Sequence, residues 1–81
     1  MNYLLEIKAF YDWLEVNQLS TSGIALWHAL MHIANKTGWQ DTFTVATVVL
    51  STKTGLKRDA FYNARTALQN KGLISFKVRT G

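Results

Sequence analysis

The stretch TGLKRDAFYNARTALQNKGLI, residues 54–74, decides the fold. Within it, Phe61, Ala64 and Leu68 recur at intervals of three and four residues, which places them on one stripe of a helix. Most positions between them are polar or charged, so this stripe is the face that the helix would bury. The pattern therefore predicts an amphipathic helix over residues 58–71, with a glycine as its stop signal.

A turn and a second helix precede this helix. Val45, Val48, Val49 and Thr52 have helical spacing, which predicts a short helix just before residue 54. Gly55 then supplies the positive φ that a tight turn between two helices needs. The order of helix, turn and helix is that of a helix-turn-helix.

Two further helices are expected closer to the N-terminus. Apolar residues at helical spacing predict one over residues 3–14, with an apolar arc wider than a single core contact requires. A second, over residues 20–38, is apolar nearly all round and should be the central helix; Ser20 suits its N-cap and Gly38 a left-handed C-cap. It should pack on the helix over residues 58–71 through Trp27, Leu30, Phe61 and Leu68.

Two short segments alternate with a period of two, which is typical of strands. Residues 43–45 are expected to form an edge strand, and residues 73–79 a basic wing strand with Ile74 and Phe76 facing inward. The predicted fold class is therefore mainly α with a small β wing, a winged helix-turn-helix, in one domain spanning residues 1–81.

Composition limits the class of protein. The 81 residues are 48% hydrophobic and 17% charged, which fits one folded domain and excludes a disordered chain. With no cysteine there is no disulfide framework, thiolate zinc site or cysteine nucleophile, and we expect a cytoplasmic protein. The first 16 residues have the pattern of neither a signal peptide nor a membrane span.

Charge is distributed unevenly along the chain. Residues 1–45 carry two basic and four acidic residues, a net charge of −2, whereas residues 46–81 carry seven basic and one acidic, a net charge of +6. A basic surface of this kind favours phosphate backbones or acidic protein surfaces, and a solvated basic face without a partner is the alternative.

The candidate site is the outward face of the helix over residues 58–71 with the cations around it. Asp59 on that face would be repelled by phosphate. The face either contacts DNA or, as the alternative, contacts another protein. Arg65 lies close to the buried stripe, so we expect it to pair with an acidic group of residues 1–45 or of a partner subunit and not with DNA. Lys71 should support the helix C-terminus. The predicted DNA-binding residues are Lys53, Lys57, Arg58, Tyr62, Asn63, Thr66, Lys77 and Arg79.

Other chemistry finds little support in the sequence. His28 and His32 have the spacing of two metal ligands on one helix, but no third ligand is evident, and a buried or interface histidine is the expected role. No phosphate loop, nucleophile elbow or catalytic triad appears, so we expect neither an enzyme nor a bound cofactor or metal.

Nearly the whole chain resembles the N-terminal domain of DnaD-type primosomal proteins and of phage replisome organisers. The resemblance rests on FYDWL at residues 10–14, IALWHALM at residues 24–31, the Gly38-Trp39 step and the stretch from residue 43 to residue 74. It implies a role in starting DNA replication, self-association as a dimer or larger species, and partners such as a helicase loader. Lys57 departs from the family, which often has a Ser or Thr N-cap there. The absent return strand after Gly81 indicates an N-terminal fragment of a longer protein.

Two other functions fit the same pattern. The helix-turn-helix stretch is equally typical of transcription regulators of the GntR or MarR kind. A protein-interaction module that does not bind DNA is the second alternative, in which the wing strand and the aromatic first helix would contact partners.

Overall fold

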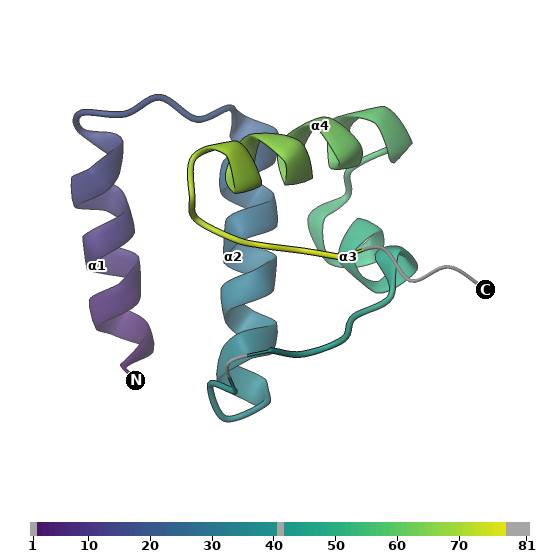
Figure 1. Ribbon diagram of the computed structural model, residues 1–81, viewed down its shortest axis with the longest axis horizontal. Helices are drawn as coiled ribbons and strands as arrows, with labels where there is room; N and C mark the ends of the chain where they lie inside the picture. Colours follow the sequence, from purple (N-terminus) through teal and green to yellow (C-terminus); the bar gives the residue numbers. More distant parts are fainter. Residues whose placement is uncertain (1, 41, 78–81) are drawn as a thin grey trace.

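Four helices form where the sequence predicts them, in a computed structural model that describes residues 2–40 and 42–77. They are α1 (Tyr3–Leu14), α2 (Thr21–Lys36), α3 (Thr47–Thr54) and α4 (Arg58–Asn70) (Figure 1). All four helical segments are thus confirmed. None of the helices in this part of the chain is long and apolar enough to cross a membrane.

The predicted β wing is wrong. Residues 43–45 and 73–77 are not strands, and the described residues contain no sheet; Val78 and Arg79 of the expected wing lie outside them. The alternation of apolar and polar residues in the segment 73–77 has another cause. Ile74 packs against the core, while Ser75 is exposed. The backbone N–H of Phe76 donates to the side chain of Gln69 on α4, at 3.1 Å, instead of to a ladder partner. An extended segment lying over a helix buries every second side chain just as a strand does.

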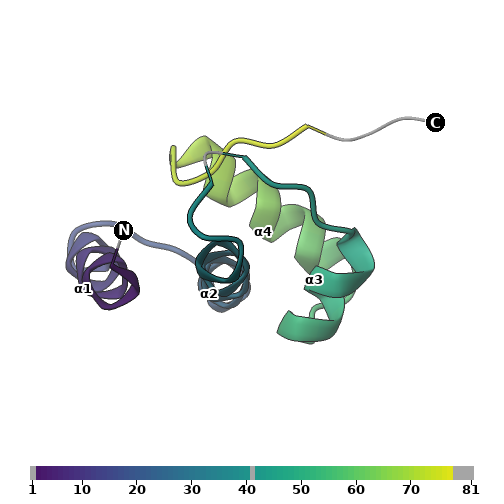
Figure 2. The same ribbon diagram turned by 90° about the horizontal axis from the view of Figure 1, so that it is seen from below.

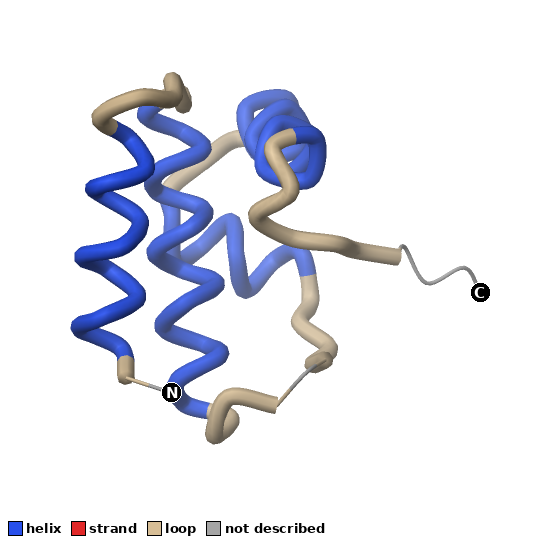
Figure 3. The backbone as a smooth tube through the Cα atoms, turned by 60° about the vertical axis from the view of Figure 1, so that its left-hand side comes forward, coloured by secondary structure: helices blue, strands red, loops and turns tan. Residues whose placement is uncertain are grey.

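The central helix of the molecule is α2. It runs antiparallel beside α1, while α3 and α4 lie on its other side (Figures 1 and 2). The helical hairpin of α1 and α2 is also clear in the view of Figure 3. Because α2 contacts three helices, it buries the most residues, as its apolar sequence predicts: Gly23, Leu26, Trp27, Ala29 and Ala34.

The helices end at the expected capping residues. The Ser20 hydroxyl accepts a hydrogen bond from the Gly23 N–H at 3.0 Å and caps α2. At the other end of α2, Gly38 has a φ of 79° and the N–H of Trp39 donates to the Ala34 carbonyl at 2.8 Å, which is a left-handed cap. Gly55 has a φ of 73°, which lets the chain turn from α3 into α4 within three residues.

The core lies between α2 and α4, and α1 packs against it from one side. Leu26, Phe61 and Leu68 are almost completely buried where α2 meets α4. The ring of Phe10 from α1 stacks on Trp27 with 3.8 Å between ring centroids. The predicted packing of α2 on α4 is confirmed, and it determines which face of α4 is exposed.

Candidate nucleic-acid interface

The face of α4 turned away from the core is polar. Phe61, Ala64 and Leu68 are buried on the inner stripe, as predicted. On the other side, the predicted contact residues are exposed: Tyr62, Asn63 and Thr66. Asp59 is exposed on the same face. This surface offers hydroxyl and amide groups, which can donate or accept hydrogen bonds at base edges or phosphates.

Basic side chains lie at the start of this face and beside it. Lys57 and Arg58 are exposed at the start of α4, and Lys77 is exposed in the segment that returns along the helix after Gly72. Arg79 lies outside the described residues. Lys57 occupies the N-cap position of α4, and its side chain forms no capping hydrogen bond. The first N–H groups of the helix therefore keep the partial positive charge of the helix dipole.

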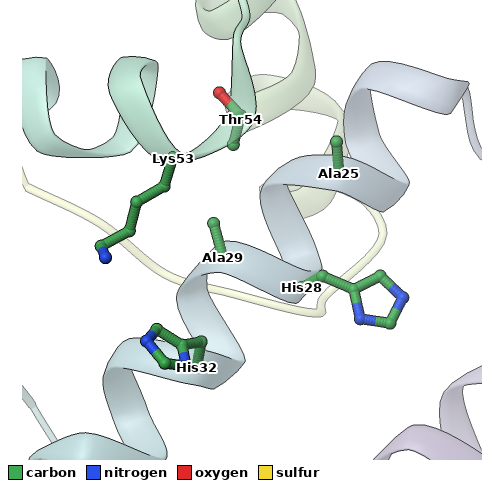
Figure 4. A pocket seen from close by; sticks show the side chains of 6 residues that line it. All are labelled: Ala25, His28, Ala29, His32, Lys53 and Thr54. Atoms are coloured by element: carbon green, nitrogen blue, oxygen red, sulfur yellow. The ribbon is translucent and has the colours of Figure 1, made fainter.

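Lys53 lies in a different environment. It lines an open hollow between α2 and α3 together with Thr54 of its own helix (Figure 4). The α2 side of this hollow consists of Ala25, His28, Ala29 and His32. In Figure 4 the Lys53 side chain lies on the same side of α2 as His32, whereas the His28 ring points away from it. Lys53 thus belongs to α3 and not to the outward face of α4.

The two histidines point away from each other (Figure 4). Their rings extend to different sides of α2 (Figure 4), and the described residues include no group of three or more side chains that could hold a metal ion. The Nε2 atom of His28 is 3.1 Å from the Tyr11 hydroxyl, a hydrogen bond that joins α2 to α1. The expectation of an interface histidine is confirmed for His28.

A row of alternating cations and aromatic rings runs along one edge of the α4 face. The guanidinium carbon of Arg65 is 4.9 Å from the ring centroid of Tyr62 and 4.2 Å from that of Phe76. On the other side of the row, the guanidinium carbon of Arg58 is 5.9 Å from the Tyr62 centroid. We call these four residues the cation–aromatic row: Arg58, Tyr62, Arg65 and Phe76.

No acidic group among the described residues pairs with Arg65, and an acidic group of a partner subunit stays a prediction. Its guanidinium contacts aromatic rings, and its Nε atom is buried without a hydrogen-bond partner. The spacing of Arg58, Tyr62 and Arg65 at intervals of four and three was a signal for neighbouring side chains on one helix. Nothing in the local sequence indicated that Phe76 would cover the end of this row.

Comparisons of the chain with protein families, with curated proteins and with solved structures found no match. The case for function therefore rests on the surface of α4 and on the charges around it.

Proposed function

We propose that this protein is a DNA-binding domain that presents the outward face of α4 to duplex DNA. The observation that carries the proposal is one polar helix face, with Asn63 and Thr66 exposed, next to exposed cations at the start of α4 and on the segment that returns along it. The net charge of +6 over residues 46–81 supports it, because clustered positive charge attracts the phosphate backbone.

The proposal divides the work between two kinds of side chain. Lys57, Arg58 and Lys77 neutralise phosphates and position the protein, whereas Asn63 and Thr66 contact base edges. The uncapped N-terminus of α4 adds a partial positive charge beside Lys57 and Arg58. Asp59 weakens the attraction to phosphate and so limits binding at random sites.

The proposed setting is the initiation of DNA replication in the cytoplasm, in line with the resemblance to DnaD-type proteins. There the domain would act with copies of itself and with replication proteins such as a helicase loader.

A protein-interaction role has one specific observation in its favour. Leu4 and Leu5 on α1 are 59% and 60% exposed, on the side of the molecule away from α4 (Figure 2).

The test is a salt titration of binding to a labelled duplex, followed by fluorescence anisotropy. If lysines bind phosphates, the affinity should fall with salt with a log–log slope of about −0.9 per contact. Lys57→Ala and Lys77→Ala should each weaken binding to every sequence and bring that slope closer to zero by about one. Lys8→Ala is the matched control, because Lys8 is exposed on α1, on the far side of α2 from α4.

Asn63→Ala and Asp59→Asn test the remaining roles. Asn63→Ala should lower the preference for a specific site with little change in slope, because an amide releases no counterion. Asp59→Asn should strengthen binding. Binding that is undetectable at low salt, or that responds to Lys8→Ala as strongly as to Lys57→Ala, would reject this surface as a DNA site and favour the protein-interaction role.

A further inference from the structure

The cation–aromatic row has a geometry that simple surface charges lack. Tyr62 lies between two arginines that are four residues before it and three residues after it on α4. Both guanidinium carbons lie within 6 Å of its ring centroid, at 5.9 Å and 4.9 Å. Phe76, brought back along α4 by its hydrogen bond to Gln69, contacts Arg65 from a second direction.

These ring contacts leave the hydrogen-bonding groups of the arginines available. The attraction between a guanidinium and a ring comes from its charge, and it does not use the N–H donors. No salt bridge with a described carboxylate occupies Arg58 or Arg65, although Asp59 lies on the same helix. The Nε atom of Arg65 is buried and has no acceptor among residues 2–40 and 42–77, so the terminal N–H groups are the ones that can reach a ligand. Within these residues the guanidinium takes part in no ion pair.

The aromatic partners also reduce the cost of binding. A free arginine loses rotamer entropy when it is fixed on a ligand, whereas one already held against Tyr62 loses less. The planar fork of an ordered guanidinium matches two oxygens of a phosphate group. Bases are the poorer fit, because Arg65 occupies the ring of Tyr62 on which a base would stack.

We propose that Arg58 and Arg65, ordered by Tyr62, form a phosphate-binding site on α4 for the backbone of nucleic acid. The proposal rests on the DNA-binding function above and deepens it. It identifies Arg65, which is only partly exposed and was expected to pair with an acid, as a phosphate ligand. It makes Tyr62 a positioning residue that acts through its ring.

The first experiment measures duplex affinity, the salt slope and the melting temperature of charge-conserving variants. Arg65→Lys and Arg58→Lys keep the charge but lose the planar fork, so each should lower affinity about tenfold with the slope unchanged. Tyr62→Leu should have a similar effect, because it removes the ring. Tyr62→Phe keeps the ring and should lose less affinity than Tyr62→Leu. Tyr11→Leu, the same change at an exposed tyrosine on α1, is the matched control and should leave the affinity unchanged.

Two results would overturn the inference while leaving the proposed function intact. One is a salt-dependent duplex affinity that is unchanged in Arg65→Lys and Tyr62→Leu, even where the melting temperature falls; Arg65 would then only hold residues 73–77 in place. The other is an equal loss in Tyr62→Phe and Tyr62→Leu, which would assign the effect to the hydroxyl group.

A second experiment is independent of DNA. In a titration with inorganic tripolyphosphate, the guanidinium N–H resonances of Arg58 and Arg65 should shift together in NMR spectra, and Tyr62→Leu should weaken both shifts. If these shifts occur while the duplex does not bind, the phosphate site stands and the DNA-binding function fails. If neither resonance responds to tripolyphosphate, the phosphate site is rejected.

Discussion

At the scale of single residues, Leu68 shows how strongly the fold depends on the inner stripe of α4. It is 0% exposed and lies in the core with Leu26 and Phe61. Leu68→Ala should lower the free energy of unfolding by ~2–5 kcal/mol, because it removes buried methyl groups and leaves a cavity. Leu4→Ala makes the same chemical change at a side chain that is 59% exposed, and should cost less than about 0.5 kcal/mol. Urea unfolding followed by circular dichroism measures both; equal losses would contradict this description of the core.

Gly23 illustrates a packing constraint that helix propensity alone would miss. A Cβ atom added at this position would lie 2.8 Å from Cγ of Leu19, in the connection between α1 and α2. Alanine is favoured over glycine in a helix by about 1 kcal/mol, but overpacking costs ~1–3 kcal/mol. We therefore expect Gly23→Ala to destabilise the protein. In a Leu19→Ala background the same substitution should become stabilising, and a double-mutant cycle of unfolding free energies measures the change in sign. The same cost in both backgrounds would exclude the clash as its cause.

The roles of the side chains on α4 were only partly predictable. Helical geometry of 100° per residue correctly separated Asn63 and Thr66 from the buried stripe, because that separation depends on one helix alone. The surroundings of Arg65 depend on Phe76, which returns over α4 after the turn at Gly72. Local spacing contains no information on that return, so the sequence suggested an acidic partner instead.

At the scale of elements, the turn between α3 and α4 depends on backbone conformation and not on packing. Gly55 has a φ of 73°, and nothing lies within 4 Å of a Cβ added there. The cost of Gly55→Ala is then the cost of the left-handed conformation, about 1–2 kcal/mol. Gly55→Asn should cost less, since asparagine tolerates this conformation. Thermal unfolding would compare the two variants; an equal loss would show that the turn does not depend on the left-handed conformation of residue 55.

The helices were predictable and the wing was not, for a physical reason. A helix forms its hydrogen bonds within one segment, so periodicity and capping residues such as Ser20 and Gly38 locate it from sequence. A strand needs a partner that local sequence does not identify. The alternation of residues 73–77 records which side chains point to the core, and the Gln69 side chain takes the N–H of Phe76 that a ladder would have used.

At the scale of the whole molecule, α2 separates two surfaces of different character. On one side, α1 carries Glu6 and Asp12 against Lys8, and Glu15 follows at its C-cap. On the other side lie α3 and α4, with the exposed cations of the proposed DNA interface (Figure 2). Repulsion of the acidic side by phosphate would orient the molecule on DNA with α4 inward, which leaves α1 free for a protein partner.

Self-association through α1 is the prediction at this scale. The wide apolar arc of α1 suggests it from sequence. An unpaired wing strand would have offered a second contact, but residues 73–77 do not form that strand. Leu4 and Leu5 are 59% and 60% exposed on α1, and burying them against a second copy would remove apolar surface from water. Sedimentation velocity at micromolar concentrations should therefore show a dimer or larger species. The double substitution Leu4→Glu and Leu5→Glu should shift it toward the monomer. Val48→Glu, at a side chain 70% exposed on α3, should not. A wild-type protein that sediments only as a monomer would remove α1 as a site of self-association, and duplex binding by α4 would then have to be explained for a single copy.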